Sequence, residues 1–276
     1  MQRLFALILA AVLPASVVAI APPPDAQAAG AAGAVVKMRL RAMIKHLPVA
    51  NERRAGYDRD KFRHWIDADR DCRDTRDEVL ANESRTRVRG CDIRVGRWVS
   101  AYDGRRVRFS TNLDIDHMVP LAESWDSGAK RWNAGTRKRF ANDLGDRRSL
   151  IAVTASTNRS KSDRDPAEWM PRRGKCAYVQ QWVAVKTRWS LKVDRREKQA
   201  LIRRANHCKN TVIRVRKATV RTGTSAGGGG GGGGVDPRFD YCYQANDAGY
   251  GNYVRGRDRE YSWYTDGDSD GVVCET

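Results

Sequence analysis

Three side chains in the middle of the chain could together hydrolyse a phosphate ester. Asp116 and His117 are adjacent, and Asn158 follows further along. A neutral histidine can take a proton from water, because its unperturbed pKa of about 6.5 lies near neutrality. Carboxylate and amide oxygens are the hard ligands that Mg²⁺ prefers, with water and phosphate oxygens as further ligands. An activated water and a cation beside the phosphate are what phosphodiester hydrolysis requires.

The segments that carry these residues predict a strand, a loop, a second strand and a helix. Residues 113–121 alternate like a strand that Pro120 ends, and residues 150–154 form a second apolar strand. A helix should begin at Ala155, with Ser156 or Thr157 as its N-cap. Adjacent side chains of an ideal strand point to opposite faces. Asp116 and His117 can therefore serve one site only if the strand turns or bulges there.

Five short motifs give this region a specific resemblance. They are Asp116–Glu123 (DHMVPLAE), Trp125–Ala129 (WDSGA), Phe140–Leu144 (FANDL), Asn158–Asp163 (NRSKSD) and Asp165–Trp169 (DPAEW). Together they resemble the secreted bacterial HNH endonucleases, which are ββα-metal nucleases related to the C-terminal domain of GmrSD-type restriction enzymes. The similarity covers roughly residues 57–208. It implies an α+β fold with a ββα-metal nuclease core and added helices.

The resemblance also implies roles for particular residues. His117 would be the general base, and Asp116 and Asn158 would hold Mg²⁺ or Mn²⁺. The family opens its second strand with Asn-Leu, whereas this chain has Ser149-Leu150 there. Asn142 could orient His117 in place of that asparagine, or could only cap a loop.

Three further residues have two interpretations each. Asp114 is either another metal ligand or a solvent-facing carboxylate. Arg159 and Lys161 lie one turn inside the expected helix, where they either hold phosphates or form a solvated basic face.

The N-terminus has the pattern of an export signal. Residues 4–20 are almost wholly apolar, and Ala26-Gln27-Ala28 fits a small-x-small cleavage site. A membrane anchor is the alternative, but the apolar run is short for a spanning helix and contains Pro14. We expect a signal peptide over residues 1–28 and a secreted, extracellular mature protein without a membrane segment.

Export makes the six cysteines interpretable, because an even number outside the cell indicates disulfides. The spacing favours three local bridges: Cys72–Cys91, Cys176–Cys208 and Cys242–Cys274.

A run of eight glycines, residues 227–234, divides the chain into two modules of opposite charge. Such a run is a flexible tether. The formal net charge of +18 separates into −5 for residues 235–276 and +23 for the remainder. The predicted organisation is a signal peptide (1–28), an N-terminal segment (29–58), an HNH-type nuclease domain (59–210), a basic and then glycine-rich linker (211–234) and an acidic module (235–276).

Other elements are expected from local patterns. Residues 35–47 have apolar residues at helical spacing before Pro48, and residues 178–189 and 194–206 predict two more helices. Asp194 with Glu197 forms an acidic capping-box variant. The charged segment between Cys72 and Cys91 predicts an irregular loop without a core.

The acidic module ends in a calcium-loop pattern. Asp266, Asp268 and Asp270 alternate before Gly271, and Glu275 follows at the tenth position of the loop rather than the twelfth that an EF-hand requires. This segment resembles the small excalibur module of bacterial extracellular proteins. The resemblance implies calcium binding by these four acidic residues, braced by Cys242–Cys274.

The sequence therefore predicts a secreted, metal-dependent endonuclease acting on DNA, with RNA as a further substrate and little sequence preference. We expect a monomer, with cell-wall polymer as a further partner of the tail and a cell-wall-associated location as one outcome. The alternative is a non-catalytic cationic protein that binds nucleic acid or cell-wall polymer and carries a calcium-dependent surface module.

Overall fold

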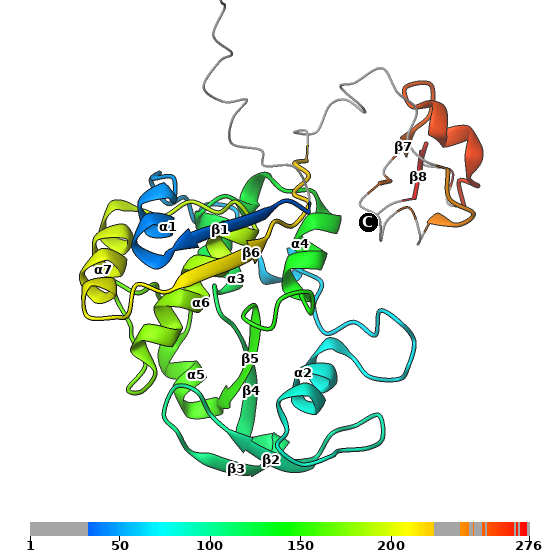
Figure 1. The fold of residues 1–276 in the computed structure, drawn as a ribbon. Helices are drawn as coiled ribbons and strands as arrows, with labels where there is room; N and C mark the ends of the chain where they lie inside the picture. The colour runs from blue at the N-terminus through cyan, green and yellow to red at the C-terminus, as the bar shows by residue number, and fades with distance from the viewer. Residues whose placement is uncertain are drawn as a thin grey trace, which may run out of the picture. The chain divides into compact units, whose positions relative to one another are not determined.

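The computed structural model describes residues 33–223 and, in the tail, residues 238–242, 245, 250–251, 253–267, 269 and 271–274. Figure 1 shows the elements along the chain. The strands are β1 (Val35–Arg39), β2 (Val95–Val99), β3 (Arg106–Phe109), β4 (Leu113–His117), β5 (Leu150–Thr154), β6 (Val212–Arg216), β7 (Tyr253–Val254) and β8 (Val272–Val273). The α-helices are α1 (Leu40–His46), α2 (Thr75–Glu83), α3 (Leu121–Asp126), α4 (Ala134–Ala141), α5 (Ala155–Lys161), α6 (Lys175–Arg188) and α7 (Arg195–Asn206). Short 3₁₀ turns lie at Arg59–Lys61, Ser110–Asn112, Ala129–Arg131 and Arg259–Trp263.

The predicted strand, strand and helix order in the middle of the chain is confirmed. β4 and β5 pair antiparallel from Leu113 opposite Thr154 to His117 opposite Leu150, and α5 follows β5 directly. The N-cap of α5 is Thr154, one residue before the helix, rather than Ser156 or Thr157. The Thr157 hydroxyl instead donates to the Thr154 carbonyl inside the first turn.

The two ends of the domain pair with each other, which the sequence did not predict. Residues 35–39 form β1 rather than helix, and the helix begins only at Leu40. β1 pairs antiparallel with β6, a strand that lies inside the segment predicted as a linker from residue 211. Ile213 and Val215 of β6 are buried in the main core. The domain therefore extends at least to Arg216, and the predicted linker boundary is wrong.

The main core surrounds α6, which is apolar on most of its circumference. Val179, Trp182 and Val183 are fully buried, and α1, α7 and β6 pack around this helix. Helices that are apolar on most faces belong in a protein interior. The predictions of α6 and α7 are confirmed, and the Asp194 carboxylate caps α7 by accepting from the Glu197 amide.

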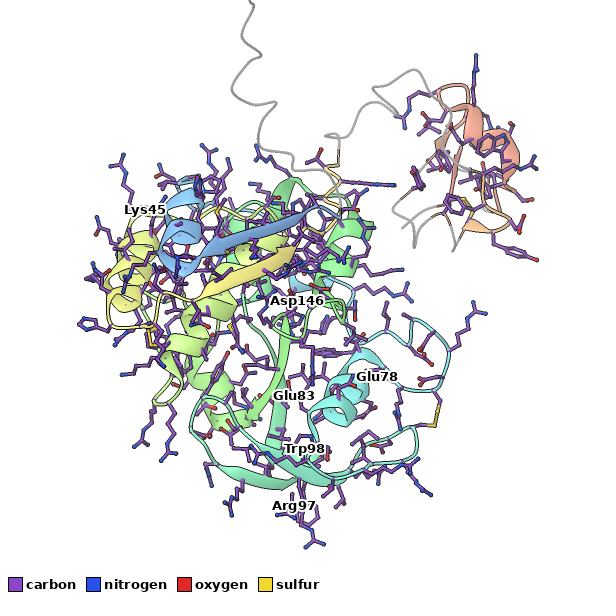
Figure 2. The ribbon with its side chains drawn as sticks, in the orientation of Figure 1. Lys45, Glu78, Glu83, Arg97, Trp98 and Asp146 are labelled. Carbon is purple, nitrogen blue, oxygen red and sulfur yellow. A yellow bond between two sulfur atoms is a disulfide. The ribbon has the colours of Figure 1, made fainter. Side chains whose placement is uncertain are left out.

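A second core lies on the other side of β4 and β5. Leu113 and Ile115 pack there against α2 and the β2–β3 hairpin, with Trp98 as the largest buried side chain. The Trp98 indole donates to the Leu80 carbonyl of α2 at 2.8 Å, and Figure 2 shows this part of the domain. The segment between Cys72 and Cys91 therefore contains a helix with a core, followed by an irregular stretch, whereas its charged sequence predicted only an irregular loop without a core.

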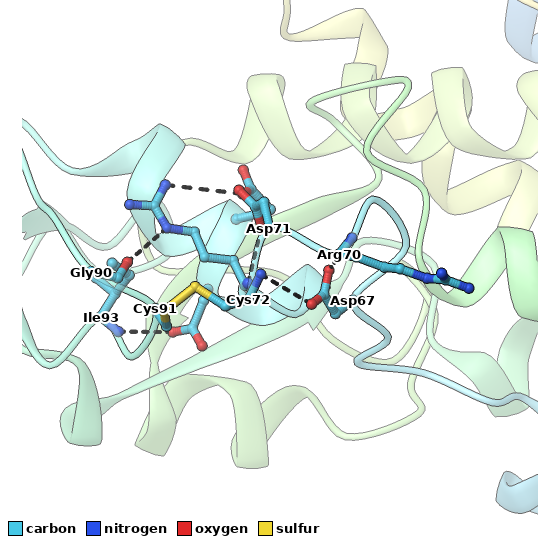
Figure 3. The surroundings of a disulfide bond; sticks show 10 residues. Asp67, Arg70, Asp71, Cys72, Gly90, Cys91 and Ile93 are labelled. Atoms are coloured by element: carbon cyan, nitrogen blue, oxygen red, sulfur yellow. Dashed lines mark hydrogen bonds and ion pairs between the residues drawn. A yellow bond between two sulfur atoms is a disulfide. The ribbon is translucent and has the colours of Figure 1, made fainter.

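All three predicted disulfides are confirmed: Cys72–Cys91, Cys176–Cys208 and Cys242–Cys274. Around the first of them, the Asp67 carboxylate accepts from the amides of Arg70 and Cys72 (Figure 3). The Arg73 guanidinium donates to the Gly90 carbonyl at 2.9 Å. This bridge thus closes a polar loop whose backbone groups are satisfied locally.

The C-terminal module has a small core of Tyr253, Val273 and Cys274 beside the β7–β8 pair. The Asp266 carboxylate accepts from the Gly271 amide and the Tyr261 hydroxyl, which closes the acidic loop. Asp268, Asp270 and Glu275 lie outside the described residues, as do the signal peptide and the eight glycines. None of the described helices is long and apolar enough to cross a bilayer.

Substitution of Ile213 tests whether β6 is part of the domain. Ile213→Ala should destabilise the protein by about 2–5 kcal/mol, because it leaves a cavity in the main core. The exposed neighbour Arg214→Ala should change stability by less than about 0.5 kcal/mol. Urea denaturation followed by tryptophan fluorescence measures both. Equal, small effects would show that residues 212–216 belong to a linker after all.

Candidate active site

Asp116 is buried and bound by a lysine from α5. The Lys161 ammonium donates to both Asp116 carboxylate oxygens at 2.8 Å and to the His117 carbonyl at 2.9 Å. The Tyr102 hydroxyl donates to Asp116 Oδ2. Burial raises the pKa of Asp116 and lowers that of Lys161, although each charge acts against the shift of the other. The two residues thus form a buried ion pair that joins β4 to α5.

This ion pair corrects the role predicted for Lys161. Its side chain has no exposed surface and its ammonium is held by three oxygen atoms, so it is not available to a phosphate in this structure. Arg159, on the same helix, is exposed and remains accessible to a polyanion. Asp116 was predicted as a metal ligand. In the structure both of its carboxylate oxygens accept from the Lys161 ammonium.

A second contact between β4 and α5 lies next to this pair. The Asn158 amide donates to Asp114 Oδ2 at 3.1 Å, and both residues are partly exposed. Asp114 and Asp116 share one face of β4, because side chains of a strand alternate. Asn158 and Lys161 share one face of α5, because they are three residues apart. The Asp114 carboxylate and the Asn158 amide oxygen fit the hard donor set of a divalent cation.

The side chain of His117 points to the face of β4 opposite the side chains of Asp114 and Asp116. The pairing with β5 stays regular to Leu150, so the turn or bulge that would bring Asp116 and His117 to one face is not present. The imidazole stacks on Trp65, with 5.4 Å between ring centroids, and on Phe140 at 6.4 Å. Only 7% of the residue surface is exposed. The two predicted partners therefore lie on the two sides of one strand end.

The environment of His117 determines which ring nitrogen is basic. Burial lowers its pKa to about 3, so the imidazole is neutral at physiological pH. Nε2 lies 2.9 Å from the Ala141 carbonyl, which can only accept, so Nε2 carries the proton. Nδ1 is then the unprotonated nitrogen, and it has no hydrogen-bond partner among the described residues.

Asn142 holds the backbone that orients this histidine. Its amide nitrogen donates to the carbonyls of Arg63 and Lys138, and its oxygen accepts from the Ile66 amide and the Thr75 hydroxyl. It is also the C-cap residue of α4. Asn142 thus caps α4, and its hydrogen-bond partners among the described residues do not include His117; the carbonyl that accepts from His117 belongs to the preceding residue, Ala141.

Two side chains at the site were missed by the sequence analysis. Tyr102 lies in a turn with no motif, and only the fold brings its hydroxyl to Asp116. Trp65 has a φ of +58°, in the left-handed region that bulky residues rarely adopt. Backbone strain of this kind is concentrated at functional sites. In the sequence, the only sign that Trp65 belongs to the site is its position next to His64.

Comparison with known proteins matches this part of the chain. The family model of the GmrSD restriction endonuclease C-terminal domain matches residues 69–204, which include β4, β5 and α5. The chain belongs to this family. The GmrSD C-terminal domain is followed by a match to the Excalibur calcium-binding domain over residues 239–275.

One curated relative shares most of its length with this chain. An uncharacterized secreted protein of Arthroderma benhamiae is 41% identical over 157 residues, which are 55% of this chain and 76% of the relative. No solved structure matches the chain.

Removal of Lys161 should show how strongly the buried pair holds the GmrSD C-terminal domain together. Lys161→Met leaves the Asp116 carboxylate buried without its counter-ion, which should cost about 3–5 kcal/mol. The double variant with Asp116→Asn should recover part of that loss, since the two residues interact directly. Arg159→Met, on the exposed side of α5, is the matched control and should be nearly neutral. Urea denaturation checks all three, and a neutral Lys161→Met would refute the buried pair.

Proposed function

We propose that the chain is a secreted HNH-type endonuclease that hydrolyses phosphodiester bonds of DNA, and also of RNA, with little sequence preference. The family match supports a nuclease. The observation that carries the finer proposal is the orientation of His117. Its Nε2 proton is directed at the Ala141 carbonyl, and its unprotonated Nδ1 has no partner among the described residues. A neutral histidine held in one tautomer presents a defined nitrogen as proton acceptor, and its pKa of about 3 would have to rise toward neutrality for His117 to act as an efficient general base.

In this proposal the chain supplies the base and its orientation. Nδ1 of His117 takes a proton from the attacking water. The Ala141 carbonyl continues to accept from Nε2 and stabilises the charged ring that results. Asn142, the residue after Ala141, contacts three backbone groups, those of Arg63 and Ile66 in one segment and of Lys138 in α4. Trp65 and Phe140 stack on the imidazole ring.

Asp114 and Asn158 are the residues that would hold a divalent metal, Mg²⁺ or Mn²⁺. They are in contact and partly exposed, whereas the Asp116 carboxylate beside them is bound by Lys161. When bound, such a metal would supply positive charge beside the phosphate. Asp114 and Asn158 lie on the face of β4 opposite His117, so the metal and the base would act on one phosphate only if the end of β4 turned. Asp116 would join this set only with loss of its contact to the Lys161 ammonium.

The distribution of charge supports a polyanionic substrate. Six acidic residues of the domain are buried: Asp116, Glu123, Asp126, Asp143, Asp165 and Glu197. Among its described basic residues only Lys161, Lys186 and Arg188 are buried. The surface is therefore more positive than the formal charge of the chain indicates. Such a surface binds a phosphate backbone without reading its sequence, and the binding weakens as salt rises.

Secretion and the calcium module complete the proposal. The Arthroderma relative is described as secreted, three disulfides are present, and the first 28 residues have the pattern of an export signal. Calcium would bind the Excalibur module through Asp266, Asp268, Asp270 and Glu275. We propose that the mature protein is a monomer whose tail can also contact cell-wall polymer.

Cleavage of supercoiled plasmid by purified mature protein tests this function. We expect nicking and linearisation in Mg²⁺ or Mn²⁺ and none in EDTA. His117→Ala should lower the rate by about 10²–10⁴-fold, the contribution of a general base, while keeping salt-sensitive DNA binding. Asp114→Asn and Asn158→Ala should each shift the metal dependence to higher concentrations.

Two results would contradict the proposal. His207→Ala changes an exposed histidine and serves as the matched control, so equal losses in both histidine variants would remove His117 as the base. Uncut plasmid in Mg²⁺, Mn²⁺ and Ca²⁺, with DNA still bound, would favour the non-catalytic cationic binder. That alternative agrees with the Asp116 carboxylate being closed by Lys161.

A further inference from the structure

A cluster of carboxylates lies outside the site described above. It consists of Glu52, Glu123, Asp126, Asp165, Asp194 and Glu197, called here the acidic cluster. These residues come from the N-terminal segment, α3, the loop after α5, and α7 with its N-cap. One oxygen each of Glu52, Glu123 and Asp126 lie within 4.8 Å of one another. Glu52 makes a second such group with Asp165, Asp194 and Glu197.

These distances fit a single calcium ion. Ca²⁺ binds carboxylate oxygens at about 2.3–2.6 Å, so two oxygens on opposite sides of the ion are about 4.6–5.2 Å apart. Three oxygens within 4.8 Å of one another are therefore close enough to share one ion.

One oxygen in this cluster lacks a partner. Asp126 is 8% exposed, and its Oδ2 accepts from the Arg54 guanidinium at 2.7 Å. Its Oδ1 is buried and has no hydrogen-bond partner. The Glu52 carboxylate, which belongs to both groups, also has no hydrogen-bond partner among the described residues and is the exposed member of the cluster. A buried carboxylate oxygen without a donor is costly unless something positive contacts it.

The cations of the protein do not balance the cluster. Lys186 lies between Glu123 and Glu197, at 2.5 and 3.2 Å, and Arg54 binds Asp126. Two basic side chains thus contact three of the six carboxylates, and among the described residues no ion pair joins a basic side chain to Glu52, Asp165 or Asp194. Although Glu52 is exposed, its carboxylate is partly desolvated; this desolvation first, and then the neighbouring carboxylates, raise the pKa of Glu52 to about 7. Burial also raises the pKa of Glu197 to about 8, against the charge of Lys186.

We propose that the acidic cluster binds a calcium ion, with Glu52, Glu123 and Asp126 as its protein ligands and water completing the shell. Asp165 and Asp194, which group with Glu52 and Glu197, add negative charge near the ion. Calcium fits better than Mg²⁺, because it tolerates irregular carboxylate sets and does not require a near-ideal octahedron. We expect an affinity of about 0.1–1 mM, in the range of extracellular calcium modules.

The ion would fasten the N-terminal segment to the nuclease domain. Glu52 precedes Arg54, whose guanidinium also binds Asp163 at 2.6 Å just after α5. Asp126 and Glu123 belong to α3, which begins four residues after His117. The site is thus a structural one that holds together the segments on either side of the candidate active site.

Calcium-dependent thermal unfolding of the full mature chain tests the proposal. The tail is first silenced by Asp266→Asn, Asp268→Asn and Asp270→Asn, so that the Excalibur module does not contribute. In this background 5 mM Ca²⁺ should raise Tm by about 2–4 °C over EDTA, through preferential binding to the folded state. Glu52→Gln should abolish that rise and weaken calcium binding at least about tenfold in equilibrium dialysis. Glu52 is exposed, so the variant should fold.

Further variants assign the site. Asp126→Asn keeps an acceptor for Arg54 but replaces one carboxylate oxygen with an amide nitrogen, and it should also abolish the rise in Tm. Asp69→Asn changes the exposed group of Asp67, Asp69 and Asp71 and should not alter the calcium response. An unchanged response in Glu52→Gln, or no response in the tail-silenced parent, would overturn the proposal.

Discussion

The contact between the Lys161 ammonium and the Asp116 carboxylate is the interaction on which the arrangement of the candidate site depends. It joins the first strand of the ββα unit to its helix, and the Tyr102 hydroxyl and the His117 carbonyl complete the set of partners. A buried ion pair need not add net stability, but loss of one partner is severe, so both residues are constrained together. With Asp116 fixed in this way, the register of β4 decides that Asp114 faces Asn158 and that His117 faces the other side.

The same principle recurs through the domain. Lys186 is buried between Glu123 and Glu197, and Arg188 makes two hydrogen bonds to the Asp143 carboxylate. The contacts to Glu123 and Asp143 tie α6 to segments distant in sequence, and the contact to Glu197 ties it to the next helix, α7. Because the buried charges are mainly acidic, the basic residues are left at the surface. The interior and the exterior of the domain therefore have opposite electrostatic character, and this favours a polyanionic substrate without any single basic motif.

Local sequence patterns were enough to predict the strands and the helix that carry the candidate site. The features that were not predicted depend on contacts between residues far apart in the sequence. β4, β5 and α5 follow from alternation and a helix start within 50 residues. Residues 35–39 also fit a helical pattern, and only pairing with a strand about 170 residues away makes them β1. The buried position of Lys161 was not predictable, since a lysine on a charged helix is normally exposed and its partners come from other elements. The orientation of His117 likewise depends on a backbone carbonyl, which no motif encodes.

The pairing of β1 with β6 has a consequence for the order of folding. The domain is complete only when the chain as far as Arg216 is available, because its first strand pairs with its last. Contacts so distant in sequence form slowly and late. A chain threaded outward from its N-terminus cannot close this ribbon until nearly the whole domain has crossed the membrane. Removal of the chain after residue 211 would therefore leave β1 without its partner strand and expose its unpaired backbone edge.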